Sequence, residues 1–418
     1  MAKITNVKGR QVFDSRGNPT VEAEVFLDTD ISATAISPSG ASTGAFEAHE
    51  LRDLDKNSFL GKSVKNAIEN INKKISISLK GLDPEDQSKI DKVLIDLDGS
   101  ENKKILGANA TLAVSLANSK SAALLAKKPL YKNLGKSFSL PNPLMNIING
   151  GAHADNDLKI QEFMIRPDSA KNFTDAVEKC FLVIQNLKNL LKSKKMLTNV
   201  GDEGGFAPSL STNEEALELI VSAIEKSKLK PEKDIAICLD VAANELVNEE
   251  GQYSIQSKNY VSVTDVVNYY KKLTSNYPIK SIEDPFAEED WESWKKITAE
   301  IGKKVQIVGD DLFVTNSKRL KKGVENNSAN SILVKPNQIG TLSETLEVIE
   351  IAKNAKFKTI ISHRSGDTED TFIADLAVAT ESSQIKTGSL ARSERVAKYN
   401  RLLRIEEDLG NKAKIAKI

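Results

Sequence analysis

The chain has 418 residues, and its 58 lysine and arginine residues balance 58 aspartate and glutamate residues, so the formal net charge is zero. This length allows two domains, and the balanced charge argues against direct nucleic-acid binding or attraction to a membrane surface. Cys180 and Cys238 are the only cysteines, which favours a reducing compartment over a disulfide framework. Both lie in apolar segments, so we expect them to be buried and inert.

The sequence has no segment typical of a secretory signal or a membrane span. The first 17 residues lack an apolar core, and no run of about 20 apolar residues occurs anywhere in the chain. We therefore expect a cytoplasmic protein with no membrane span.

The first third of the chain predicts a small α+β domain, which we place at residues 1–135. Two strands are expected around an Arg-Gly-Asn-Pro turn, because Val21, Ala23 and Val25 alternate with glutamates. Helical stretches follow, of which residues 109–128 are the clearest. Proline and glycine near residue 138 end this domain.

A polar loop of small residues, 37–44, lies within this first domain. Its backbone groups and hydroxyls suit a lid that closes over a charged ligand and excludes water. The same composition is also typical of a loop that is merely flexible.

Residues 136–418 predict an (α/β) barrel. The turn-rich segment 148–156 joins two apolar runs and predicts a hairpin. From about residue 234, six short apolar runs each stop at a charged residue, and these end residues lie 23 to 43 positions apart. That spacing fits βα units with a parallel sheet. Together with the hairpin, the runs predict a closed eight-stranded barrel, with an open doubly wound sheet as the structural alternative.

Three of the predicted strands end in carboxylates, Asp240, Glu283 and Asp310. At one barrel mouth these groups would repel each other unless a cation lay between them. A set of oxygen ligands suits Mg²⁺ better than Zn²⁺. The alternative is N-capping of the following helices, which fits aspartate but not glutamate. The joint pattern favours a metal site.

Lys335 interrupts an otherwise apolar predicted strand. Close to divalent cations and partly desolvated, its ammonium form would be disfavoured, so a neutral amine could take a proton from carbon. Schiff-base chemistry also uses a barrel lysine and remains open at this point.

The last strand ends supply hydrogen-bond donors and cations, His363, Arg364, Ser365 and Lys386. An anionic ligand would explain why cations face a mouth that already carries acids. His153 lies in the predicted hairpin turn and is one of three histidines. A lone loop histidine is more often structural.

Glu203 lies in a glycine-rich turn, residues 201–205, that is followed by Phe206, Ala207 and Pro208. A solvated turn is the simple interpretation, but such a turn does not need the apolar residues. We expect the glycines to bring the carboxyl group close to a ligand, and the apolar neighbours and nearby acids to favour its neutral form.

In order along the chain, these segments closely resemble the enolase family. The resemblance covers nearly the whole chain and implies an N-terminal α+β domain and an enolase-type barrel whose first strands are partly antiparallel. The implied activity is that of a glycolytic lyase, phosphopyruvate hydratase. The matching stretches are "DSRGNPTVE", "SGASTG", "NGGAHADN", "QEFMI", "GDEGGFAP", "SIEDP", "GDDLFVTN", "VKPNQIGT", "SHRSGDTED", "IKTGS" and "YNRLLRIEE".

The resemblance implies two Mg²⁺ ions in each active site. Asp240, Glu283 and Asp310 match the ligands of the tighter ion. Ser42, in the polar loop, matches a ligand of the second ion, which binds together with the substrate.

The resemblance also implies catalytic roles, with Lys335 matching the base and Glu203 the acid. The implied substrates are 2-phosphoglycerate and phosphoenolpyruvate. Positions around the substrate are matched by His153, Gln161, Glu162, His363, Arg364, Ser365 and Lys386.

The family further implies a cytoplasmic homodimer or octamer, with cell-surface exposure or secretion without a signal peptide left open. The chain departs from the family pattern at "DVAANELVN" and in its basic tail, and neither segment contains an assigned residue except Asp240. The alternatives are a superfamily member that acts on another carboxylate, a Schiff-base aldolase, and a non-catalytic binding protein.

Overall fold

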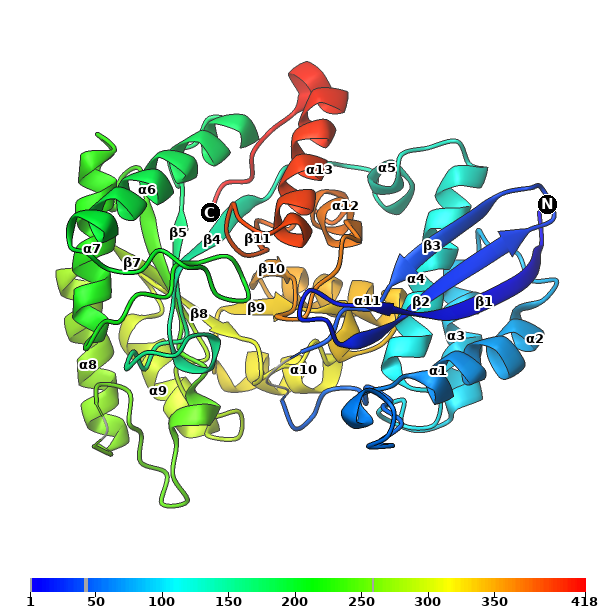
Figure 1. Cartoon of the computed structure of the whole chain (residues 1–418), viewed down its shortest axis with the longest axis horizontal. Coiled ribbons are helices and arrows are strands. Elements are labelled where there is room, and N and C mark those ends of the chain that lie inside the picture. The colour runs from blue at the N-terminus through cyan, green and yellow to red at the C-terminus, as the bar shows by residue number, and fades with distance from the viewer. Residues whose placement is uncertain (1, 41–43, 258) are drawn as a thin grey trace.

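The computed structural model of this chain describes residues 2–40, 44–257 and 259–418. Ser42, the predicted ligand of a second metal ion, lies outside the described residues. A small sheet with its helices lies at one end of the molecule, and a barrel surrounded by helices forms the rest (Figure 1).

The N-terminal part is built on an antiparallel sheet of β1 (Ile4–Phe13), β2 (Pro19–Leu27) and β3 (Ser32–Ile36). The predicted two strands and turn are confirmed, because the turn closes where the Asp14 carboxylate accepts the backbone N–H groups of Arg16 and Asn18. Besides the long helix α4, which is described next, the α-helices of this part are α1 (Lys65–Asn70), α2 (Ser76–Leu79), α3 (Gln87–Asp98) and α5 (Leu130–Leu134).

The predicted helix at 109–128 is observed as α4 (Ala108–Leu125), which packs against β2 and β3. Alanine, serine and leucine fill this helix, and it is buried along nearly its whole length. Its small side chains let it pack closely against the sheet, and it also contacts the barrel segment Pro336–Gln338.

The barrel confirms the prediction of eight strands. It closes in the order β10-β11-β4-β5-β6-β7-β8-β9. Strand β5 runs antiparallel to both of its neighbours, and the other neighbouring pairs are parallel, so the open-sheet alternative is wrong. The strands are β4 (Asn142–Asn149), β5 (Glu162–Arg166), β6 (Ala236–Asp240), β7 (Ile279–Glu283), β8 (Gln306–Gly309), β9 (Ser331–Val334), β10 (Lys358–Ser362) and β11 (Gln384–Lys386).

The barrel interior is a packed apolar core. Six buried side chains, one from each of six strands, form a separate apolar cluster there, in keeping with the filled interior of such barrels. One of them is Cys238, and burial raises the pKa of its thiol to about 12. Cys180 is also buried, so the expected burial of both cysteines is confirmed. The six residues are Leu144, Met164, Cys238, Val308, Leu333 and Ile360.

Helices surround the barrel, and their N-caps exclude one interpretation of the strand-end acids. The helices that follow β6, β7 and β8 are capped by Ser262, Asp290 and Asn316. The acids that end the strands are therefore not caps. The helices are α6 (Phe173–Ser193), α7 (Asn213–Lys226), α8 (Val263–Asn276), α9 (Trp291–Ile301), α10 (Ser317–Asn326), α11 (Leu342–Asn354), α12 (Phe372–Ala379) and α13 (Ser393–Leu409).

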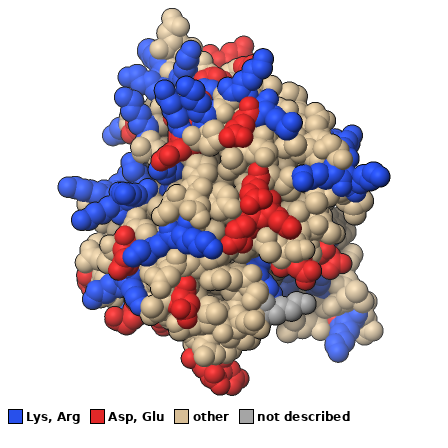
Figure 2. All heavy atoms as spheres, turned by 90° about the vertical axis from the view of Figure 1, so that its left-hand side faces the viewer, with Lys and Arg blue, Asp and Glu red and all other residues tan. Residues whose placement is uncertain are grey.

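The surface reflects the balanced composition. The face on the left of Figure 1 carries both basic and acidic side chains, with the basic ones gathered toward one end (Figure 2). Within the described residues, no helix has the length and apolar character that crossing a membrane would require.

Candidate active site

The charged residues predicted at the strand ends meet at one mouth of the barrel. All of them except Glu283 line a hollow of about 450 Å³, including its opening to solvent. Glu283 is not in the lining and instead contacts Lys386. The glycine-rich turn and the β4–β5 hairpin also reach this hollow. Its lining residues include His153, Gln161, Glu162, Glu203, Asp240, Asp284, Asp310, Asp311, Lys335, His363, Arg364, Ser365 and Lys386.

Lys386, at the end of β11, lies among the carboxylates of three other strands. Its Nζ is 2.9 Å from Asp240 Oδ2, 2.8 Å from Glu283 Oε1 and 3.2 Å from Glu162 Oε1. Burial disfavours the ammonium form, but the carboxylates outweigh burial and raise the pKa of Lys386 well above its usual range. Gln161 completes the group, with its Nε2 3.5 Å from Asp240 Oδ2.

Lys335, at the end of β9, pairs with the Asp310 carboxylate. Burial alone would lower the pKa of Lys335, but Asp310 outweighs burial and the pKa is raised. Facing this carboxylate, Lys335 favours the ammonium form; the predicted neutral amine concerns a lysine close to bound divalent cations. The other oxygen of Asp310 accepts a hydrogen bond of 2.9 Å from Gln338 Nε2.

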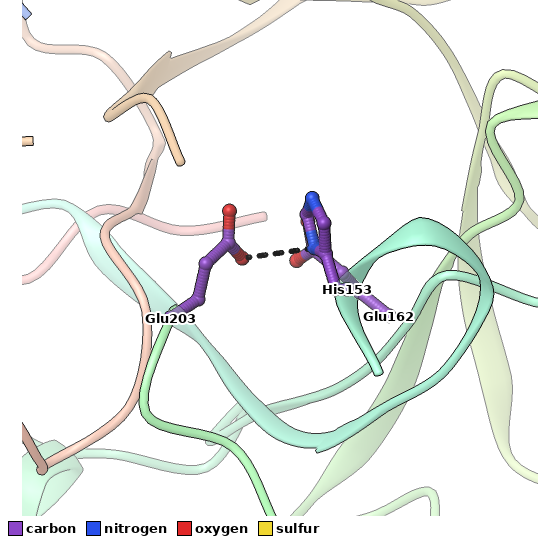
Figure 3. Close-up of side chains that lie close together, drawn as sticks. All are labelled: His153, Glu162 and Glu203. Carbon is purple, nitrogen blue, oxygen red and sulfur yellow. Dashed lines mark ion pairs between the residues drawn. The ribbon is translucent and has the colours of Figure 1, made fainter. Parts of the chain in front are cut away.

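Glu203 lies opposite a histidine and a second glutamate (Figure 3). His153 Nδ1 is 3.9 Å from Glu203 Oε2 and 3.7 Å from Glu162 Oε1. Asn146 donates to Glu203 Oε2 over 3.1 Å, and His363 Nε2 lies 3.5 Å from Glu203 Oε1. All five side chains belong to the barrel part, and they come from different strands and loops.

The expected neutral form of Glu203 is not what its surroundings favour. Burial would raise its pKa, but the imidazoles of His363 and His153 outweigh burial, and the pKa lies well below the usual range. The pKa of Glu162 is instead raised well above its usual range by burial and by the charge of Glu203. Of the two carboxyl groups, the surroundings thus favour the proton on Glu162, because burial and neighbouring acids outweigh its contact with Lys386, whereas donors surround Glu203.

Glycines bring the Glu203 turn close to the barrel, as expected. A Cβ at Gly205 would lie 2.3 Å from Asn149 Oδ1, and one at Gly204, where φ is +84°, would lie 2.7 Å from the Ala391 carbonyl oxygen. Phe206 exchanges backbone hydrogen bonds with β4 residues Ile147 and Asn149. The apolar residue after the turn thus fixes the turn to the barrel.

Arg364 is held by an acid from the N-terminal part. Its Nη1 is 2.7 Å from Glu47 Oε2, and its Nη2 is 3.2 Å from Glu47 Oε1. The side chain of Arg364 is 3% exposed, so the pair is shielded from solvent and from salt. Ser365, the next residue, is buried and lines the same hollow.

The donors in the hollow fit a divalent cation. Two groups of side chains in the described residues could hold a metal ion, Asp284, Asp310 and Asp311 in one group and His153, Glu162 and Glu203 in the other, with ligand atoms within 4.8 Å of one another in each. Burial and neighbouring acids raise the pKa of Asp284 well above its usual range. Such crowding of buried carboxylates favours a bound cation.

Buried oxygens without partners point the same way. Glu162 Oε2 and Gln161 Oε1 are buried and accept no hydrogen bond from the described residues. An unsatisfied buried polar group costs about 1–3 kcal/mol. A ligand or cation in the hollow would offset that cost.

The sequence analysis did not identify several residues that hold the site together. Asp284 accepts the backbone N–H groups of Asp310 and Asp311 at 2.9 Å and so orients the end of β8. Gln338 and Glu47 hold Asp310 and Arg364. Asp284 and Gln338 lie in the stretches "SIEDP" and "VKPNQIGT", which is the one signal that could have indicated them.

Comparison with known proteins identifies the family. Residues 4–134 match the model of the enolase N-terminal domain, and residues 137–418 match that of the enolase C-terminal TIM barrel domain. The chain is 61% identical over 420 residues to an enolase of Pelagibacter ubique (strain HTCC1062), with both chains covered over their whole length. The chain therefore belongs to the enolase family, and its function is that of a glycolytic enolase, a lyase with phosphopyruvate hydratase activity.

Proposed function

We propose that this hollow dehydrates 2-phosphoglycerate reversibly to phosphoenolpyruvate, with Lys335 as the base and Glu203 as the acid. One observation carries the proposal: both side chains line the same hollow. Lys335 contacts Asp310 there, whereas Glu203 lies near His363. Buried carboxylates line the same hollow, together with the cationic side chains that an anionic substrate needs.

The base must remove a proton from C2, next to an ionised carboxylate, which adds negative charge to an anion. Bound Mg²⁺ supplies Lewis-acid stabilisation of that charge. Lys335 has to be neutral to accept the proton. Engagement of Asp310 as a metal ligand would remove the partner that keeps Lys335 charged, and burial then favours the neutral amine.

The acid must protonate the hydroxyl at C3, because hydroxide is a poor leaving group. The surroundings of Glu203 in the hollow favour its ionised form, so Glu203 has to gain a proton before it can act as the acid. An anionic substrate nearby would raise its pKa. His153 Nδ1 lies 3.9 Å from Glu203 and 3.7 Å from Glu162, whose pKa is raised, so we propose His153 as the group through which the proton is passed.

We propose Asp240, Glu283 and Asp310 as the ligands of the tighter Mg²⁺. All three are buried at neighbouring strand ends, and Lys386 and Lys335 are the cations that pair with them. A second Mg²⁺ would bind with the substrate and use Ser42, which lies outside the described residues.

The substrate phosphate and carboxylate would be held by the donors of the same hollow. Arg364 offers a planar fork suited to phosphate, and Lys386 a point charge. The remaining substrate contacts that we propose are His153, Gln161, Glu162, His363 and Ser365.

We further propose a division into an N-terminal capping domain, 1–135, and a catalytic barrel, 136–418. The family resemblance supports a homodimer or octamer in the cytoplasm, and the balanced charge supports no direct nucleic-acid binding.

The test follows absorbance of phosphoenolpyruvate formed from 2-phosphoglycerate, with Mg²⁺ and after chelation. Turnover should require Mg²⁺, and Glu203→Gln should lower kcat by about 10²-fold or more while Mg²⁺ binding is retained. Glu215→Gln, on α7 outside the hollow, is the matched control and should keep its turnover. Full activity after chelation, or borohydride trapping of Lys335, would contradict the proposal.

A further inference from the structure

Arg395 of α13 is a fully buried cation next to the catalytic groups. Its side chain is 0% exposed. The guanidinium lies 2.6 Å from His363 Nδ1, and it donates to the carbonyl oxygens of Arg364 at 2.6 Å, Ser365 at 2.7 Å and Asp202 at 3.1 Å. A buried arginine is expensive unless its donors are used, and here one guanidinium holds two segments of the active site.

The contact between Arg395 and His363 determines which ring nitrogen carries the proton. A guanidinium has only donors and stays protonated in proteins, so His363 Nδ1 must accept. The ring is then a neutral imidazole whose proton is on Nε2. That nitrogen is buried, has no hydrogen-bond partner among the described residues, and lies 3.5 Å from Glu203 Oε1. Its N–H group therefore lies beside the Glu203 carboxylate.

The same guanidinium also fixes the position of Glu203. It binds the carbonyl of Asp202, and the carbonyl of Glu203 itself accepts the N–H of Ser389 at 2.8 Å. Gly388, where φ is +74°, makes this approach feasible, because a Cβ there would lie 2.6 Å from the Glu203 carbonyl oxygen and 2.9 Å from Arg395 Cδ. The end of β10, the glycine-rich turn and the start of α13 thus converge on Arg395.

We propose that Arg395 is a positioning residue that fixes His363 as the Nε2–H tautomer facing Glu203. With a donor at Nε2, His363 has no lone pair toward Glu203 and cannot take the proton that Glu203 needs. The proton of Glu203 then has the substrate oxygen at C3 as its acceptor. This inference rests on the proposed role of Glu203 as the acid, and Arg395 acts only through His363 and the turn.

Nitrogen-15 NMR of the ring nitrogens tests the tautomer without any mutation at the site. The chain has only three histidines, so His49→Gln and His153→Gln assign the signals. In the wild type, His363 Nδ1 should resonate as a non-protonated nitrogen and Nε2 as a protonated one, around neutral pH. Exposed His49 should show the averaged signals of a free imidazole. A protonated Nδ1 in His363 would overturn the proposal.

Kinetics of Arg395→Lys test the consequence. Lysine lacks the planar fork, so its one ammonium group cannot hold Nδ1 together with the carbonyls of Arg364 and Ser365. Nδ1 then loses its fixed donor and can gain a proton, and kcat should fall about 10²-fold with little change in KM. Arg401→Lys is the matched control, because Arg401 lies on the same helix and pairs with Asp375 away from the hollow. It should keep both tautomer and kcat.

The two variants together separate the explanations. Loss of kcat in Arg395→Lys with an unchanged His363 tautomer would overturn the proposal, as would an altered tautomer with full kcat. Should Arg395→Lys fail to fold, the wild-type spectrum alone decides. Normal turnover of Glu203→Gln would refute the acid role instead, while leaving the measured tautomer unaffected, so the two failures are distinguishable.

Discussion

At the scale of single residues, the site is defined by buried charges that face one another. Burial and neighbouring acids raise the pKa of Glu283 well above its usual range. Carboxylates also raise the pKa of Lys386 well above its usual range, although burial alone would lower it. Neither group would be buried alone, because an unpaired charge in the interior is very costly. The residues of the hollow therefore depend on one another, and single substitutions leave a buried charge without its partner.

The buried imidazole of His363 leads to a prediction about how the stability of the folded chain depends on pH. Its pKa is about 4, lowered chiefly by burial, whereas the ordinary value is 6.5. Between these values the unfolded chain binds a proton that the folded chain does not, so stability should fall as pH falls through this window. The expected slope from this group approaches about 1.4 kcal/mol per pH unit, or about 3 kcal/mol in total.

Chemical unfolding at several pH values measures this contribution. The variant His363→Gln has no imidazole to protonate and should show a shallower loss of stability between these pH values than the wild type. His49→Gln removes an exposed histidine and should follow the wild-type curve. Equal slopes for the wild type and His363→Gln would contradict a neutral, buried His363.

Site residues could be recognised from the sequence where a charged residue interrupts or ends an apolar run. They could not be recognised where the site depends on contact between segments that are distant in the sequence. Asp240 and Lys335 stand out in the sequence because each ends a strand. Glu47 does not, because its partner Arg364 lies 317 residues away. Arg395 lies in a helix rich in charged residues, and the sequence alone does not distinguish it from a solvated cation.

At the scale of elements, loops around the barrel mouth carry the chemistry and glycines set their spacing. The loop after β11 passes the Glu203 turn so closely that Gly388 has no room for a side chain. The sequence predicted the strands well, since buried strands read as short apolar runs. The antiparallel pairing of β5 with β4 followed from the predicted hairpin at 148–156. Its antiparallel pairing with β6 followed only from the family resemblance, because an apolar run does not encode its direction.

Gly388→Ala should lower both stability and activity. Its positive φ costs about 1–2 kcal/mol for an alanine, and the Cβ would also push the Glu203 carbonyl away. Gly251→Ala is the matched control, because Gly251 has a φ of +71° and open space around it. Both variants should lose similar backbone stability in thermal unfolding, but only Gly388→Ala should lose kcat. Equal kcat values for the two would show that the close approach has no role.

At the scale of the whole molecule, the N-terminal part completes the barrel mouth. Glu47 reaches Arg364, and Ser39 exchanges backbone hydrogen bonds of 2.8 and 2.9 Å with Gly366. Helix α4 also joins the two parts, with Thr111 Oγ1 donating to the Gly340 carbonyl at 2.9 Å. The barrel could be predicted from its repeats, but these joints could not, because they link segments that share no local pattern.

Metal binding should stabilise the whole chain. A ligand that binds only the folded state adds about 2.7 kcal/mol at 100 times its Kd, so Mg²⁺ should raise the midpoint of thermal unfolding. Asp310→Asn should lose most of this increase, whereas Asp96→Asn, at an exposed position of α3, should keep it. An equal increase in both variants would place the metal elsewhere.

The exchange of the C2 hydrogen of 2-phosphoglycerate with deuterated solvent, followed beside phosphoenolpyruvate formation, tests the division of labour between Lys335 and Glu203 most directly. The roles proposed here predict that Lys335→Ala loses both exchange and product, while Glu203→Gln keeps exchange and loses product. Exchange at the wild-type rate in Lys335→Ala, or normal product formation in Glu203→Gln, would contradict them.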